Sequence, residues 1–286
     1  MANIRIVTDT AHNLPEDIAR EIPMVEVPFK VRVGEDEYDD NDLTLADLAR
    51  LLERRKGRYP STSAPPPYDF QQIFRASKNF DGVVVITIGS AYSAACNNAL
   101  QAVETFRDQT KSKLPIEVVD SRGGTMNQGF LVMEANELLV SGRSLRETAE
   151  KLRESADKDK LVFALKETTY LYRSGRAKRV QHLLASILRV KPVLALNNGE
   201  LALLDRIRGD IRKAYQRVVE EVLTRSNGVI EKLAIIGGLG TEEGEEYLLG
   251  EILSRLSVQP REILHAKMCP AIMVHVGPHG VGAAWV

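Results

Sequence analysis

The segment VVVITIGSAYSAACNNAL, residues 83–100, carries the pattern that decides the fold. Its first six residues, 83–88, are uncharged and apolar or β-branched, which is typical of a strand buried on both faces. Gly89 and Ser90 then interrupt the pattern, and Ser93 stands at the expected N-cap of an alanine-rich helix. A strand that turns directly into a helix presents free backbone N–H groups and the positive end of the helix dipole. We therefore expect an anion-binding corner here.

The composition predicts a globular chain without a strong net charge. It has 286 residues, with 38 Lys and Arg against 39 Asp and Glu, and a net charge of −1. This balance argues against a dedicated nucleic-acid binder, and the length suits one large domain or two ordinary ones. Cys96 and Cys269 form no disulfide framework. We find no signal peptide and no apolar run long enough to cross a bilayer, so we expect a cytoplasmic protein.

Strands and helices alternate in the first half of the chain. The apolar patterns predict strands at 4–8, 24–33, 83–88 and 116–119, and helices at 16–21, 44–55, 69–77 and 125–140. Three of these strands end in polar residues, which indicates a parallel sheet with one ligand-facing edge. Asp9, at the end of the first strand, either faces a ligand at that edge or caps the following turn.

Residues 59–67, YPSTSAPPP, form a proline-rich segment between two predicted helices. The prolines make it stiff and extended, so that the hydroxyls of Ser61, Thr62 and Ser63 are held at fixed positions. A connector between domains is the other interpretation of such a composition.

The second half of the chain has a different pattern. A capping box at Ser144 and Glu147 begins a helix that ends in the charged run 157–160, where we place the domain boundary. Beyond it we predict strands at 162–165, 233–236, 262–266 and 272–276, a hairpin at 192–204, and helices at 211–223 and 242–256. The prediction is a two-domain α/β protein: an N-terminal parallel-sheet α/β/α domain, residues 1–160, and a C-terminal α+β domain with a largely antiparallel sheet, residues 161–286.

Nucleotide and metal motifs are missing from the sequence. There is no P-loop, and the Gly-Gly-Leu-Gly run 237–240 lacks the spacing of a dinucleotide fingerprint, so we interpret it as a plain strand-to-helix turn. The five histidines are scattered, and His275 and His279 bracket Gly277-Pro278, which favours a turn over a ligand pair. We expect neither a metal nor a cofactor.

A serine hydrolase or acyl-transfer enzyme is the alternative that the sequence leaves open. Ser93 and His275 would form the nucleophile–base pair, and Asp9 or Asp120 would orient the histidine. Ser93 does not stand in a Gly-x-Ser-x-Gly elbow, however. We therefore expect a chain without catalytic residues.

Several motifs together resemble the DegV family, the bacterial fatty-acid-binding proteins that include the binding subunit of fatty acid kinase. They occur in the family's order over nearly the whole chain. The matching segments are Ile6 to Thr10 with Leu14-Pro15, Pro60 to Ser63 with Pro66, Ser90 to Ala99, Asp120-Ser121, Gly175-Arg176, Lys191 to Leu194, Arg206 to Ala214 and His275 to Pro278.

The resemblance implies a long-chain fatty acid bound between the domains, with its tail in the N-terminal domain and the C-terminal domain closing the head-group cleft. The family's carboxylate contacts fall on Thr62 and Ser93, with His275 close to the head group. Other residues that we expect near the head group are Ser61, Ser63, Gly277, Asp9 and Arg176.

The resemblance also implies a mechanism in which the chain presents the carboxylate to a separate kinase for acyl-phosphate formation. Ligand exchange would involve transient contact with a membrane surface. The candidates for kinase or phosphate contacts are Arg173, Arg176, Arg206, Arg208, Arg212 and Lys213, which could equally form a solvated basic face.

The chain departs from the family's pattern at three places. Ser93-Ala94-Ala95-Cys96 replaces Ser-Gly-Thr-Tyr, His279 replaces a glycine, and Ala11-His12-Asn13 lacks the usual Asp before Leu-Pro. These departures leave the length of the acyl chain and the identity of the kinase open.

Overall fold

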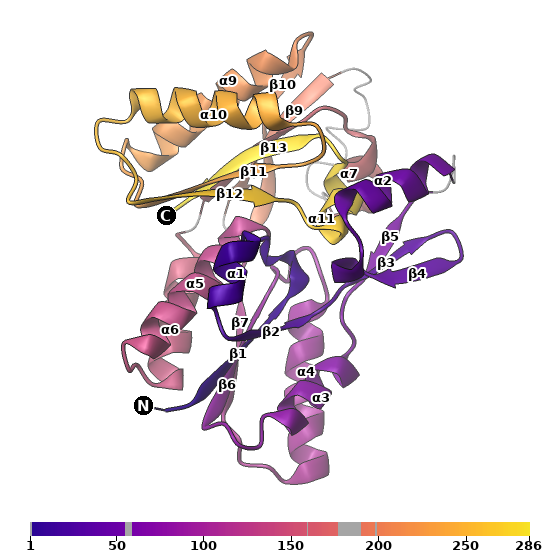
Figure 1. Cartoon of the computed structure of the whole chain (residues 1–286), viewed down its shortest axis with the longest axis vertical. Coiled ribbons are helices and arrows are strands. Elements are labelled where there is room, and N and C mark those ends of the chain that lie inside the picture. Colours follow the sequence, from indigo (N-terminus) through magenta and orange to yellow (C-terminus); the bar gives the residue numbers. More distant parts are fainter. Residues whose placement is uncertain (1, 55–58, 159, 177–189, 198) are drawn as a thin grey trace.

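The computed structural model describes residues 2–54, 59–158, 160–176, 190–197 and 199–286. Its main body consists of two β-sheets with helices between and outside them (Figure 1). This arrangement confirms the predicted fold class, a parallel sheet followed by a largely antiparallel one.

The first sheet is parallel and has the strand order β2-β1-β6-β7. Its strands are β1 (Ile4–Asp9), β2 (Met24–Val27), β6 (Gly82–Thr87) and β7 (Ile116–Asp120). All six residues of β6 are buried, as the uncharged run 83–88 predicts. Val83 and Val85 pack against α3 (Pro67–Ala76) and α4 (Ala95–Thr110), and Val84 and Ile86 face α5 (Met126–Val140) and α6 (Leu145–Ala156). The alternation of a strand therefore gives this sheet two apolar faces, each covered by helices.

The second sheet has the order β10-β9-β8-β13-β11-β12 and is antiparallel except for the β11–β12 pair. Its strands are β8 (Lys160–Leu165), β9 (Val190–Asn197), β10 (Glu200–Arg208), β11 (Lys232–Gly237), β12 (Glu262–Lys267) and β13 (Gly280–Trp285). Helices α9 (Ile211–Ser226) and α10 (Glu242–Arg255) cover its outer face. The strand β13 lies in the middle of the sheet and was not predicted from the sequence.

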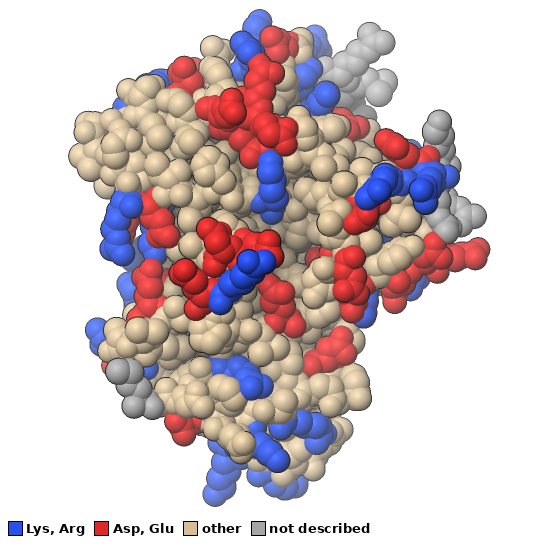
Figure 2. Space-filling view, in the orientation of Figure 1, with Lys and Arg blue, Asp and Glu red and all other residues tan. Residues whose placement is uncertain are grey.

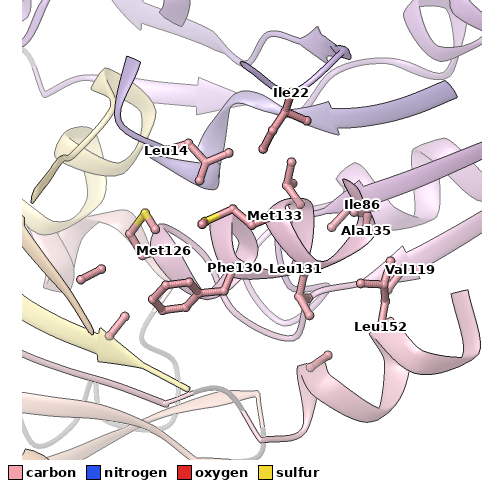
Figure 3. Packing of buried hydrophobic residues seen from close by; sticks show 14 of the residues in the cluster. Leu14, Ile22, Ile86, Val119, Met126, Phe130, Leu131, Met133, Ala135 and Leu152 are labelled. Atoms are coloured by element: carbon pink, nitrogen blue, oxygen red, sulfur yellow. The ribbon is translucent and has the colours of Figure 1, made fainter. Parts of the chain in front are cut away.

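Helix α5 packs between the two sheets. Its buried residues share one core cluster with Ile86 of the first sheet and with Ala234 and Ile236 of the second. Figure 3 shows Met126 and Phe130 of α5 in this cluster. A helix that is buried around most of its circumference joins the two halves through a continuous core, and the division into two domains near residue 160 stays a prediction.

A small antiparallel sheet, in the order β4-β3-β5, lies beside the first sheet. The remaining elements are β3 (Lys30–Val33), β4 (Asp36–Asp39), β5 (Ser61–Ser63), α1 (Glu16–Glu21), α2 (Leu45–Arg54), α7 (Thr169–Ser174), α11 (Pro270–Val276) and the 3-10 turns η1 (Thr10–His12) and η2 (Asp40–Asp42). The proline-rich segment thus contributes a strand to a sheet, so the interpretation of it as a connector is wrong.

The structure corrects two predicted strands. The predicted strand 24–33 is two strands, β2 and β3, which belong to different sheets. The predicted strand 272–276 lies in the helix α11, because Pro270 occupies its first turn and starts a helix there. The predicted turn at 197–199 includes Asn198, which lies outside the described residues.

Charged side chains of both signs are interspersed over the face of the molecule in Figure 2. Within the described residues, no helix is both long enough and apolar enough to pass through a bilayer.

Candidate functional site

A cavity that is partly open to solvent lies between the two halves of the chain. Its walls come from the residues after β1 and β6, from β5 and α11, and from the inner face of the second sheet. The polar side chains in its wall are few. They are Thr62, Tyr92, Ser93, Thr125, Arg176 and His275.

Thr62 and His275 meet at the polar end of this cavity. Thr62 pairs with Val31 in the small sheet, and its side chain is half-buried whereas Ser61 and Ser63 are exposed on the opposite face of the strand. Thr62 Oγ1 lies 2.7 Å from His275 Nε2. A contact between residues 213 positions apart therefore joins the proline-rich segment to α11.

His275 is held in its neutral form. Burial lowers the pKa of His275 to about 3, and the nearby charge of Arg176 acts in the same direction. The imidazole Nδ1 is buried and has no hydrogen-bond partner among the described residues. Arg176 also lines the cavity, so it brings a positive charge close to His275.

Ser93 lies one residue before the N-cap of α4, which is Ala94, so the predicted N-cap position of Ser93 is wrong by one residue. Its Oγ nevertheless accepts a hydrogen bond from the backbone N–H of Ala95 at 3.2 Å. This bond uses the oxygen as an acceptor and leaves the hydroxyl hydrogen to donate to a ligand. Ser93 and Ala94 line the cavity, so the positive end of the sixteen-residue helix α4 begins at the cavity wall.

Asp9 has a structural role, because its carboxylate accepts hydrogen bonds from neighbouring segments of the chain. Its Oδ2 accepts from the N–H of Ile88 at 2.8 Å, and its Oδ1 accepts from the N–H of Ala11 at 3.1 Å and from Gln128 Nε2 at 2.9 Å. Burial raises the pKa of Asp9, and its side chain is fully covered. The capping interpretation of Asp9 is confirmed. Asp9 is not among the residues that line the cavity.

Asp40 joins three segments that surround the polar end. Its Oδ1 accepts from the Thr10 hydroxyl at 2.6 Å and from the N–H of Phe29 at 3.1 Å. Its side chain also lies against Cys269, the N-cap of the helix that carries His275. Burial raises the pKa of Asp40 to about 6. Nothing in the sequence distinguishes Asp40, because it stands in an ordinary acidic run, 39–42.

The catalytic arrangement of the hydrolase alternative is not assembled. His275 Nε2 lies against Thr62, and no carboxylate among the described residues holds Nδ1. Asp120, the other proposed orienting residue, accepts from the N–H groups of Ser90 and Arg122 instead. A serine that no oriented base activates is a poor nucleophile.

The apolar wall of the cavity comes mainly from the second sheet. The strand residues on this side are Leu161, Phe163, Leu165, Leu196, Leu201, Ile236 and Val281, and Met268 follows directly after β12. The N-terminal half contributes a smaller share: Ala11, Phe29, Ala64, Ile88 and Tyr92. This distribution does not favour the prediction that the N-terminal domain holds the tail, which stays a prediction. In the sequence these residues are indistinguishable from ordinary core positions of strands.

The other predicted site residues are not among those that line the cavity. The guanidinium carbon of Arg173 lies 3.7 Å above the centre of the Tyr59 ring, and Gly277 ends α11 with a φ of 85°. Four of the residues predicted to contact a kinase are exposed on β10 and α9, and they do not line the cavity: Arg206, Arg208, Arg212 and Lys213. Over the described ranges, no three His, Cys, Asp or Glu side chains gather in a way that could hold a metal ion.

Comparison with known proteins gives one family over the whole chain. The model of the DegV family, described as uncharacterised proteins, matches residues 3–286. A DegV domain-containing protein of Caldanaerobacter subterraneus subsp. tengcongensis is 30% identical over 284 residues, which cover 99% of this chain and 98% of the relative.

Two solved structures share the fold along their full length. A DegV family protein from Thermus thermophilus, described by its fatty acid binding, has a TM-score of 0.87 and 27% identity and covers 99% of each chain. A stearic acid-binding protein from Eubacterium ventriosum has a TM-score of 0.89 and 25% identity, and the match covers 100% of this chain and 98% of that one.

Proposed function

The chain belongs to the DegV family, and from this premise we propose that it binds a long-chain fatty acid in the cavity between its two sheets. The observation that carries the proposal is the Thr62–His275 contact in the wall of a cavity whose lining residues are mostly apolar. A ligand with one small polar end and a long apolar tail matches this distribution. The fatty-acid binding described for the T. thermophilus and E. ventriosum proteins supports the same class of ligand.

The carboxylate would lie against the hydroxyls of Thr62 and Ser93. A buried carboxylate is costly unless hydrogen-bond donors meet it. Because His275 is neutral, its Nε2–H can donate to Thr62 Oγ1, which leaves the Thr62 hydroxyl hydrogen for the carboxylate. The Ser93 hydroxyl and the dipole of α4 favour the same anion, and Arg176 adds a positive charge.

The acyl tail would lie along the inner face of the second sheet, against residues such as Leu161, Phe163 and Ile236. Each buried methylene contributes about 0.8 kcal/mol, so some fifteen of them contribute on the order of 12 kcal/mol before the costs of association. The tail therefore dominates the affinity. The polar contacts fix which end of the ligand reaches Thr62.

The finer proposal is that the chain presents the carboxylate to a separate kinase and performs no chemistry itself. Arg176 and Ala94, at the polar end of the cavity, are exposed, which gives a partner access to the head group. The candidate contacts for that kinase are the exposed Arg173, Arg206, Arg208 and Lys213. A cytoplasmic location and brief contact with a membrane surface, where the acid is exchanged, belong to the same proposal.

Native mass spectrometry with lipid extraction tests the binding of a fatty acid. We expect the purified protein to carry a fatty acid, and the delipidated protein to take up one molecule of palmitate or oleate. A protein that purifies empty and takes up neither acid would show that the proposal is wrong.

The kinase step needs a separate test. Loaded protein, ATP and a candidate kinase should yield an acyl phosphate that hydroxylamine traps, and omission of the kinase should abolish it. Ester hydrolysis by the isolated chain that disappears in Ser93→Ala would instead favour the hydrolase.

A further inference from the structure

Tyr92 is a polar residue of the cavity wall that the proposed carboxylate site does not use. It belongs to the anion corner at residues 83–100, and its ring packs between two core clusters, one with Phe29 and Ala271 and one with Leu196 and Ile236. These clusters border the cavity from both halves of the chain. A ligand chain that lies between the two sheets therefore passes along this ring.

The Tyr92 hydroxyl is buried and has no hydrogen-bond partner among the described residues. A buried donor without a partner loses its bond to water and gains nothing in return, which destabilises the protein. Buried phenol hydroxyls usually have a partner for this reason. The described residues thus leave the hydroxyl of Tyr92 as a donor that a ligand can satisfy.

The charges around Tyr92 restrict which kind of ligand group can accept a hydrogen bond from its hydroxyl. Burial raises the pKa of Tyr92, and the negative charges of Glu200 and Asp120 raise it further, so the phenol stays protonated and donates. The same two carboxylates disfavour a second anion at this position. A neutral oxygen on the ligand chain fits, whereas a dicarboxylic acid does not.

We propose that Tyr92 is a specificity-determining residue which donates a hydrogen bond to a hydroxyl or keto oxygen carried on the acyl chain, so that the cavity prefers oxygenated long-chain acids over plain ones. This inference rests on the proposed function, since it needs a fatty acid whose carboxylate lies at Thr62. With that end fixed, the oxygen has to stand at one position along the chain, or at neighbouring ones. The preference is therefore a preference for particular positional isomers.

Displacement of a fluorescent fatty acid by stearic acid and by a series of its monohydroxylated isomers tests the inference. The hydroxyl moves through the series from beside the carboxyl group to the end of the chain. In the unmodified protein, we expect one isomer or a few adjacent ones to bind roughly two- to tenfold more tightly than stearate, the gain of one neutral hydrogen bond. In Tyr92→Phe, which keeps the ring, this maximum should vanish, so that every isomer binds no more tightly than stearate does.

Tyr68→Phe serves as the matched control because Tyr68 is 65% exposed and does not line the cavity. It should keep the maximum. A flat isomer profile in the unmodified protein, or a maximum that survives in Tyr92→Phe, would overturn the role of Tyr92 while the binding of stearate stands. If neither stearate nor any hydroxystearate binds, the proposed function fails and this inference fails with it.

Discussion

Replacement of Thr62 by valine removes one hydroxyl from the polar end of the cavity and changes little else. Valine has nearly the same shape and suits the strand β5, where Thr62 pairs with Val31. The hydroxyl that is lost is the one that lies 2.7 Å from His275 Nε2. We expect the fold to remain and the affinity for fatty acids to fall.

The size of the effect follows from the kind of bond that is lost. A hydrogen bond to a charged group is worth about 1.5–3 kcal/mol, so the Kd of Thr62→Val for palmitate should rise roughly tenfold to hundredfold. The unpaired His275 Nε2 adds little to this difference, because it is unpaired in the free and the bound protein alike. The tail contacts are unchanged, so binding should be weakened and not abolished.

The assay is competition against a fluorescent fatty acid, together with thermal unfolding to verify that the variant is folded. Ser63→Ala is the matched control, since Ser63 belongs to the same strand but is exposed on its other face. Its Kd should equal that of the unmodified protein. A folded Thr62→Val variant whose Kd stays within about twofold of the unmodified protein would refute the assignment of the carboxylate to Thr62.

Three further outcomes are expected. Ser93→Ala should weaken fatty-acid binding by about 1–2 kcal/mol, measured by calorimetry; an unchanged affinity would place the carboxylate elsewhere. The pKa of Asp40 rises from 3.8 to about 6 on folding, so its contribution to stability is present below about pH 4 and is lost as the pH rises through about 6. At about pH 8, the free energy of unfolding of Asp40→Asn, measured with urea, should therefore exceed that of the unmodified protein by up to about 3 kcal/mol. At about pH 4 there should be no such gain. A Cβ at residue 238 would lie 1.9 Å from the Pro278 oxygen, so Gly238→Ala should lower stability by about 1–3 kcal/mol in the same assay, whereas Gly250→Ala, which meets nothing, should not.

The parts of the fold that the sequence predicts correctly are those where one local pattern has one meaning. The run 83–88 has no charge because both of its faces are covered, and Ser144 with Glu147 forms the capping box that their spacing indicates. The segment 270–276 has no such unique meaning. A short apolar run suits a strand or a buried helix, and Pro270 at the first turn was the signal for the helix.

The residues of the site also fall into two groups, those that the sequence indicates and those that it does not. Thr62 and His275 were placed near a head group by resemblance, but their contact joins residues 213 apart and depends on how the small sheet packs against α11. Asp40 and the apolar wall could not be recognised at all. Phe163 alternates along β8 as any core residue would, and only the arrangement of the second sheet turns it toward a cavity.

The position of β13 in the second sheet has a consequence for protein synthesis. Residues 280–285 are all buried, and they pair with β8 on one side and β11 on the other. A growing chain therefore holds β8 and β11 with unpaired edges until this segment leaves the ribosome. A product that stops before residue 280 lacks a central strand of the sheet and part of the cavity lining, so degradation enzymes meet an open sheet.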